Sequence, residues 1–352
     1  MMINRRQFLQ ASGATLAASQ LLACGRELSP MAGIPRSAFD DTSTAIDVTE
    51  GINLQGKTAV VTGCTSGIGL ETLRVLAKRG AHVIGTSRSV DRAAAVGRKV
   101  EGTTSPVALD LGDLDSVVEC AETIRAMRRP IDILVCNAGY LGGGDDRQLL
   151  NGVEKHFAIN HLGHYVLVNR LLDRLFIADQ ARIVVVASRS AYTRAPKDGI
   201  LFDDLMFTRS YDDMLAYGHS KLANVLFSLS LSEALKGTRM TSNSLHPGLI
   251  NTEIDRNLGG GWQFGLKILA AINGKSIAEG AATSCYVATA KSLSNVSGAY
   301  FEDCNPVVVG GQNHLYNGEM ASKLMQVSAE LTSDHIITQT LPTRDNPFND
   351  PK

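Results

Sequence analysis

The chain has 352 residues, 44% of them hydrophobic, which is enough to bury the core of one large domain or two small ones. Its formal net charge is −1, so the basic surface that nucleic-acid binding needs is not expected. After the N-terminal leader no run of roughly 18 apolar residues occurs, and no Cys or His spacing matches a zinc site, so neither a transmembrane span nor a metal centre is expected.

The leader resembles a bacterial twin-arginine export signal, because Arg5-Arg6 precedes a mildly apolar run over 11–23. Leu21-Leu22-Ala23-Cys24 resembles a lipoprotein cleavage box with Cys24 as the lipid-bearing residue, although Leu22 is larger than the usual residue there. Residues 1–24 are therefore predicted to direct export to the periplasm or cell envelope, with a membrane anchor if Cys24 is lipidated. The alternative is an unprocessed leader on a cytoplasmic protein.

Two further segments lack a sustained hydrophobic period. Residues 25–53, with Pro30, Gly33 and Pro35, are predicted to form a tether, and residues 336–352 an irregular tail. A single domain is expected over 54–335.

Strand and helix patterns alternate along this domain. Short β-branched or apolar runs predict strands over 57–62, 81–86, 107–109, 131–136, 182–187, 241–245 and 299–301. Amphipathic patterns predict helices over 67–78, 113–128, 151–177, 211–236 and 277–290. This alternation predicts an α/β fold with a doubly wound parallel sheet of the Rossmann type, covered by helices on both faces.

Three glycines, Gly63, Gly67 and Gly69, lie between the first domain strand and its helix. In a dinucleotide-binding turn the first permits the tight turn, the second lets the backbone approach the pyrophosphate, and the third lets helix and strand pack closely. The N–H groups that begin the helix then face the phosphates. The expected cofactor-binding set also includes the residues between these glycines, namely Thr65, Ser66 and Ile68. A purely structural glycine turn is the alternative.

The second strand ends at Thr86-Ser87-Arg88, where an acidic residue would bind a ribose diol and favour NAD. Arg88 can instead pair with a 2′-phosphate, which predicts NADP(H) rather than NAD(H). The alternative is that Arg88 is a solvated surface arginine.

Five motifs occur in order: TGCTSGIG at 62–69, CNAG at 136–139, FAINHLGHYVL at 157–167, AYGHSKLANVLF at 216–227 and HPGLINTEI at 246–254. Through these motifs the chain resembles the short-chain dehydrogenase/reductase family over about residues 54–290. Within the family it is most similar to the retinol dehydrogenase-like branch. A Rossmann-type fold and hydride transfer with a nicotinamide cofactor are what this resemblance implies.

The resemblance also implies catalytic roles. Tyr217 is the expected general acid/base, and Lys221, one helical turn later, is expected to lower its pKa and to hold the cofactor ribose. Ser188 is expected to polarise the substrate oxygen, with Ser190 as a nearby alternative. Asn160 matches the family asparagine that supports a water relay to the lysine; a buried structural asparagine is the alternative.

Three further segments match family contacts with the cofactor. Asn137-Ala138-Gly139 is expected under the cofactor, Asp110-Leu111 at the adenine, and Pro247-Gly248 with Thr252 at the nicotinamide amide. Each could be only a turn. Tyr217 and Lys221 complete the expected cofactor contacts.

The expected function is therefore NADP(H)-dependent hydride transfer at a carbonyl or alcohol carbon. Alternatives are a C=C reductase that resembles the protochlorophyllide reductase-like proteins and a non-catalytic NADP(H)-binding scaffold. The glycine-rich, apolar stretch 255–275 is expected to lie over the pocket, which favours a small lipophilic substrate. By analogy with the family, the helices over 151–177 and 211–236 are expected to form a homo-oligomer surface.

Overall fold

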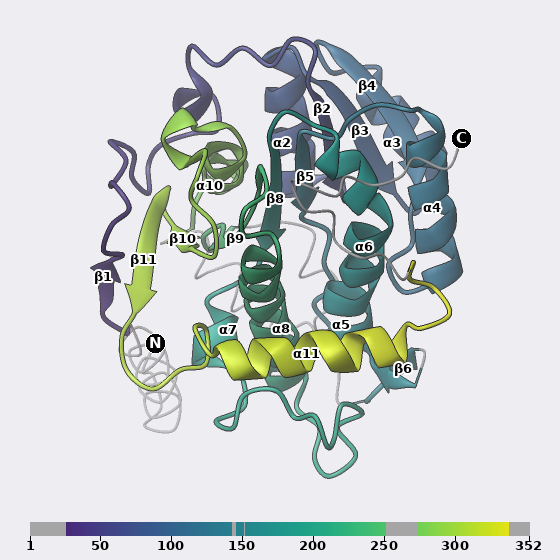
Figure 1. Cartoon of the computed structure of the whole chain (residues 1–352), viewed down its shortest axis with the longest axis vertical. Coiled ribbons are helices and arrows are strands. Elements are labelled where there is room, and N and C mark those ends of the chain that lie inside the picture. The colour runs from purple at the N-terminus through teal and green to yellow at the C-terminus, as the bar shows by residue number, and fades with distance from the viewer. Residues whose placement is uncertain (1–25, 143–145, 151, 251–273, 338–352) are drawn as a thin grey trace, which may run out of the picture.

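The computed structural model describes residues 26–142, 146–150, 152–250 and 274–337 (Figure 1). Its centre is a nine-stranded sheet with the order β1-β11-β10-β9-β8-β5-β2-β3-β4. The strands are β1 (Leu28–Pro30), β2 (Thr58–Thr62), β3 (His82–Ser87), β4 (Thr103–Ala108), β5 (Ile133–Cys136), β8 (Ala181–Val186), β9 (Met240–His246), β10 (Tyr300–Glu302) and β11 (Asn305–Val309).

The strands from β4 across to β10 run parallel, whereas β11 and β1 add an antiparallel edge. After the edge strand β1, the chain enters the parallel part of the sheet at β2, proceeds outward to β3 and β4, and then returns to place β5 on the other side of β2. This reversal is the topological switch point of a doubly wound sheet, where ligands bind at the carboxyl ends of the strands. The predicted fold class is confirmed.

Helices cover both faces of the sheet, as Figure 1 shows. Because side chains alternate along a strand, Ala59 and Val61 of β2 join one hydrophobic cluster and Val60 joins another. The first cluster lies under α2 (Gly67–Lys78) and α10 (Ile277–Thr289), and the second under α4 (Leu114–Ala126), α6 (Gly163–Phe176) and α8 (Asp213–Ala234). The remaining described α-helices are α3 (Val90–Gly97), α5 (Lys155–Phe157), α7 (Ser190–Thr193) and α11 (Gly318–Leu331). Among the described helices, none is long and apolar enough to cross a membrane.

The segment expected to be a tether packs onto the domain over its described part. Strand β1 pairs with β11, and a 3-10 helix (Asp47–Thr49) follows Ala45, whose N–H bonds to Ala278 O at 2.9 Å. Ala45 and Val48 are buried in the cluster under α10. Ala45 and Val48 are isolated apolar residues without a hydrophobic period, so the sequence pattern could not predict that this segment packs on the domain. The leader with Cys24, the stretch 251–273 with Thr252, and residues 338–352 lie outside the described residues, so their predicted roles stay predictions.

The predicted helix over 151–177 is wrong at its start. A short hairpin of β6 (Leu149–Leu150) and β7 (Val153–Glu154) comes first, with Gly152 at φ 76° between the strands. Helix α5 then leads through a π-helical turn (Ala158–Leu162) into α6. Strand β4 is longer than its predicted core over 107–109, because an exposed edge strand tolerates the polar residues and Pro106 that precede it.

Candidate active site

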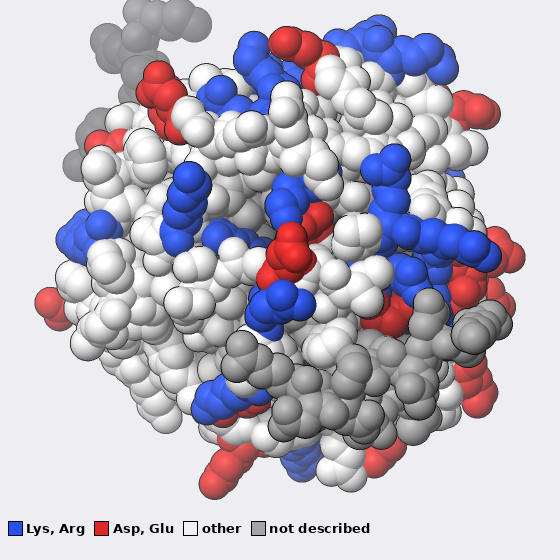
Figure 2. Space-filling model, turned by 45° about the horizontal axis from the view of Figure 1, so that its top comes forward, with Lys and Arg blue, Asp and Glu red and all other residues white. Residues whose placement is uncertain are grey.

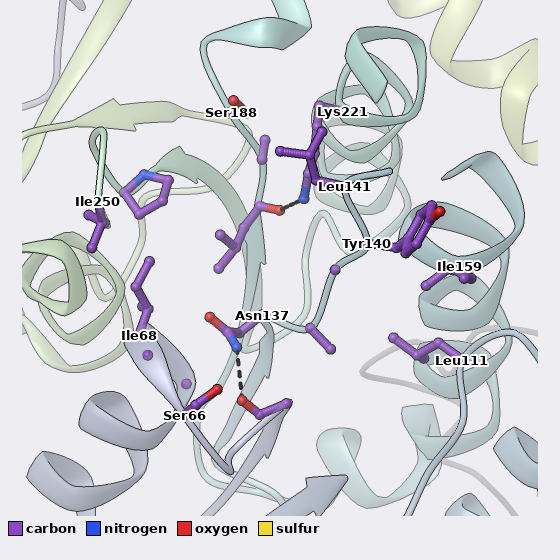
Figure 3. Close-up of a pocket in the computed structure, with 18 of the residues that line it drawn as sticks. Ser66, Ile68, Leu111, Asn137, Tyr140, Leu141, Ile159, Ser188, Lys221 and Ile250 are labelled. Carbon is purple, nitrogen blue, oxygen red and sulfur yellow. Dashed lines mark hydrogen bonds between the residues drawn. The ribbon is translucent and has the colours of Figure 1, made fainter. Parts of the chain in front are cut away.

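A pocket of about 950 Å³ opens at the carboxyl ends of the strands around the switch point. Figure 3 shows Ser66 and Asn137 on one side of it and Ser188 and Lys221 on the other. The structure brings these predicted site residues to its wall: Gly63, Thr65, Ser66, Gly67, Ile68, Gly69, Arg88, Asp110, Leu111, Asn137, Ala138, Gly139, Ser188, Tyr217, Lys221, Pro247 and Gly248. Asn160 lies behind the wall.

The glycine turn between β2 and α2 has a shape that side chains would block. Gly63 and Gly67 have φ values of 72° and 58°. A Cβ on Gly69 would lie 2.2 Å from Gly63 O and 2.4 Å from Asn137 Nδ2. The Ser66 side chain makes no capping hydrogen bond, so the first N–H groups of α2 remain available at the pocket wall. The turn therefore fits a pyrophosphate.

A second turn, Asn137 to Gly139, is held against β2 by Thr62. The Thr62 hydroxyl accepts the backbone N–H groups of Asn137 and Ala138, each at 2.9 Å. His164 Nε2 lies 3.0 Å from the same hydroxyl, and His164 Nδ1 lies 3.1 Å from Asn160 O. A carbonyl oxygen can only accept, so Nδ1 carries the proton and Nε2 accepts from Thr62. Burial lowers the pKa of His164 to about 4, which keeps the ring neutral.

The far end of the pocket carries two arginines. Arg88 follows β3 and Arg92 lies in the first turn of α3, whose N-cap is Ser89. Both side chains are exposed, and no described carboxylate forms an ion pair with either. Acidic and basic side chains are otherwise interspersed over the face in Figure 2. This end of the pocket can therefore accept an added phosphate.

Tyr217 and Lys221 lie one turn apart on α8 and are 8% and 2% exposed. Burial raises the pKa of Tyr217 to about 12, against a smaller lowering by a hydrogen bond with Ser188. Burial also lowers the pKa of Lys221 to about 8. Lys221 Nζ donates to Val186 O at 3.2 Å and lies 5.7 Å from the centre of the Tyr217 ring. In the protein alone burial dominates the pKa of Tyr217, and the expected help of Lys221 to the phenolate stays a prediction.

Asn160 lies in the π-helical turn and is fully buried. Its Oδ1 accepts the Tyr140 N–H at 2.7 Å, and its Nδ2 donates to Tyr140 O at 3.0 Å and to Ser220 Oγ at 2.9 Å. The side chain therefore joins the loop after Gly139 to the catalytic helix α8. Its part in a water relay stays a prediction.

Known proteins match the chain along most of its length. A family model described as short chain dehydrogenase matches residues 57–198. The Short-chain dehydrogenase TIC 32 A, chloroplastic, of Brassica napus is 40% identical over 309 residues, which cover 84% of this chain and 95% of that protein. Retinol dehydrogenase 12 of Mus musculus is 37% identical over 291 residues, which cover 80% of this chain and 88% of that protein. The chain belongs to the short-chain dehydrogenase family.

Solved structures agree with this assignment. An uncharacterized protein from Mycobacterium Paratuberculosis is 29% identical, with a TM-score of 0.65 and coverage of 83% of this chain and 98% of that chain. An NAD(P) dependent gluconate 5-dehydrogenase from Beutenbergia cavernae, with bound NADP, is 25% identical, with a TM-score of 0.57 and coverage of 71% and 95%. This short-chain dehydrogenase is therefore an NAD(P)-dependent oxidoreductase.

Sequence analysis missed an ion pair that fixes the segment after Ser188. The Glu302 carboxylate is 2% exposed and accepts from Arg189 Nε at 2.7 Å, Tyr192 OH at 2.8 Å and Tyr300 OH at 3.2 Å. The Arg189 backbone N–H also donates to His246 Nδ1 at 3.3 Å. No local motif signals this cluster, because Glu302 is distant from Arg189 in sequence.

The pocket wall beside the phenol is apolar. Leu141 and Met214 pack against Tyr217, and Leu249 also lines the pocket. None of these side chains can pair with a charged substrate group. Nearly all of the stretch 255–275 that was expected over the pocket lies outside the described residues.

Proposed function

We propose that this short-chain dehydrogenase transfers a hydride between NADP(H) and the carbonyl or alcohol carbon of a lipophilic substrate. One observation carries the proposal: Ser188, Tyr217 and Lys221 meet at one end of a pocket whose other end holds the glycine turn and Arg88. A pocket with the catalytic residues at one end and the glycine turn at the other fits a nicotinamide dinucleotide whose reactive ring lies beside the phenol.

The residues around the reacting oxygen have complementary roles. NADPH, when bound, supplies the hydride to the carbonyl carbon. The Ser190 N–H donates to Ser188 Oγ at 3.2 Å, and the Ser188 hydroxyl, which hydrogen-bonds with Tyr217 in the protein alone, can donate to a substrate oxygen bound beside both residues. Tyr217, protonated at neutral pH, gives its proton to that oxygen as the alcohol forms. The charge on Lys221 then stabilises the phenolate that remains. In alcohol oxidation the same groups act in reverse.

The preference for NADP(H) rests on the two arginines. Arg88 occupies the place where a carboxylate would bind the ribose diol of NAD, and Arg92 lies on the same stretch of wall. A guanidinium pairs well with the 2′-phosphate that distinguishes NADP from NAD. The Beutenbergia cavernae structure, which has bound NADP, supports this choice.

A lipophilic substrate is supported by the apolar wall beside Tyr217, formed by Leu141, Met214 and Leu249. The name of the mouse relative gives retinol, an apolar alcohol, as that protein's substrate. We extend only the chemical class to this chain.

The cofactor proposal is tested by fluorescence titration of the protein with NADPH and with NADH. Arg88→Ala should weaken NADPH binding about 10- to 100-fold, the loss of a charge-assisted contact, and leave NADH binding unchanged. Arg98→Ala, an exposed arginine at the end of α3 that does not line the pocket, is the control. Equal weakening of both cofactors by Arg88→Ala, or none, would remove Arg88 from this role.

A further inference from the structure

A histidine–carboxylate pair lies beside the catalytic tyrosine but outside the pocket wall. Glu154 and His156 are both fully buried, and His156 Nδ1 lies 2.7 Å from Glu154 Oε1. The second oxygen of Glu154 accepts the Phe157 N–H at 3.1 Å at the start of α5. The His156 ring meets the Tyr217 ring edge-on, with centroids 6.0 Å apart and an interplanar angle of 71°.

The hydrogen bonds of His156 define its tautomer. The backbone N–H of Gly142 donates to His156 Nε2 at 3.0 Å. A backbone N–H cannot accept, so Nε2 carries no proton and the neutral ring has its proton on Nδ1. That proton points to Glu154, which therefore selects the tautomer that can bind Gly142.

Asp213 is the other carboxylate near this ring. Its Oδ1 lies 3.8 Å from His156 Nε2, beyond hydrogen-bond distance, and accepts instead from Tyr211 OH at 3.0 Å. Burial is the main cause that raises the pKa of Asp213. The shorter contact with Gly142 therefore decides which nitrogen is protonated.

The loop held by His156 carries part of the substrate wall. Asn160 holds the loop at Tyr140, through both the N–H and the C=O, and His156 holds it at Gly142. Between these two anchors, Leu141 lines the pocket and packs against Tyr217. In Figure 3, Leu141 lies on the same side of the pocket as Lys221. The Tyr140 ring also packs on His156, with centroids 4.9 Å apart.

We propose that His156, with its tautomer fixed by Glu154, is a positioning residue that holds Leu141 and the edge of Tyr217 in place for the substrate. This proposal rests on the proposed function, because the apolar wall contacts a substrate only if the protein acts on a lipophilic carbonyl or alcohol. It predicts an effect on the substrate end alone, because Thr62 separately holds the turn under the cofactor, from Asn137 to Gly139.

Steady-state kinetics with NADPH and an apolar aldehyde test this role in three variants of the full chain. His156→Leu, which removes both hydrogen bonds, should raise the KM for the aldehyde about 10-fold, with the NADPH Kd within about twofold of the wild type. His156→Gln keeps an acceptor for Gly142 and should restore most of the loss. His161→Leu is the matched control, since His161 is equally buried but bonds to Ser328 of α11 at 2.7 Å.

A second measurement does not depend on turnover. Hydrogen exchange at the Gly142 amide, followed without cofactor or substrate, should be faster in His156→Leu than in the wild type and in His161→Leu. If the wild type reduces no carbonyl, the proposed function fails while the exchange result still tests the anchor. Unchanged exchange at Gly142, or an equal rise in KM in His161→Leu, overturns the inference.

Discussion

At the catalytic residues, burial sets the protonation state. The pKa of Tyr217 is raised to about 12 and that of Lys221 is lowered to about 8, in both cases mainly by removal from water. Near neutral pH the phenol is therefore protonated and most of the lysine is charged. This pair of states suits carbonyl reduction, in which the phenol gives a proton and the ammonium stabilises the resulting phenolate.

The lowered pKa of Lys221 predicts a pH dependence. Below about pH 8 the lysine is charged, and as pH rises through about 8 it loses that charge, so kcat/KM for NADPH should fall. A pH profile of kcat/KM checks this, since it reports groups of the free enzyme. Lys221→Arg, whatever its absolute rate, should lose this decline because arginine stays charged. A wild-type profile that stays flat to about pH 10 contradicts the account.

The residues that could be predicted from sequence are those whose role depends on short spacings. Tyr217 and Lys221 share a helix face because they are four residues apart, and Gly63, Gly67 and Gly69 occupy one turn. The supporting contacts could not be predicted, because they join distant positions. Thr62 and His164 are 102 residues apart, and Arg189 and Glu302 are 113 residues apart. Even Glu154 and His156, close in sequence, need the backbone N–H of Gly142, 14 residues before His156, to define their role.

At the scale of the elements, the β2–α2 turn requires glycine at position 69, because it has no room for a side chain there. Gly69→Ala places a Cβ against Gly63 O and Asn137 Nδ2, so the turn and the neighbouring loop must both shift. We expect NADPH binding to weaken at least about 100-fold, as binding geometry at the helix N-terminus is lost.

The matched control is Gly318→Ala at the start of α11, where an added Cβ meets nothing within 4 Å. This change should leave NADPH binding unchanged and raise the free energy of unfolding by about 0.4–1 kcal/mol. Titration and denaturant unfolding of both variants measure the difference. Tight NADPH binding by Gly69→Ala would show that the turn does not hold the cofactor.

The C-terminal helix α11 changes the expectation for assembly. In Figure 1 it crosses in front of α8, and its Ala321 and Leu324 join the cluster that contains Leu222 and Leu226 of α8. Part of the surface expected to form a homo-oligomer is thus covered by the chain itself, and homo-oligomer formation stays a prediction. Helix α11 has no strong sequence pattern, because its buried residues are Ala321, Leu324 and Ser328, of which one is large and apolar.

At the scale of the whole molecule, the folded unit extends upstream of the predicted boundary at residue 54. Strand β1 adds an edge strand to the sheet beside β11, and Ala45 and Val48 are buried in the hydrophobic cluster under α10. Burial of a valine side chain alone contributes about 1.5–3 kcal/mol.

A chain that begins at Leu54 should therefore unfold at a lower temperature, by roughly 4–10 °C, than a chain that begins at Arg26. Thermal unfolding of the two chains measures this, with the full chain as reference. Equal Tm values would mean that residues 26–53 contribute no stability and act as the tether that their composition predicts.

The most direct test of the central claim is NADPH oxidation with a panel of apolar aldehydes, by the wild type and by Tyr217→Phe. The phenylalanine keeps the ring that packs on Leu141 and His156 and removes only the proton donor. We expect turnover by the wild type, a loss of roughly 10²- to 10⁴-fold in kcat in the variant, and NADPH binding within about twofold. A variant that reduces the same aldehydes at the wild-type rate would contradict Tyr217 as the general acid.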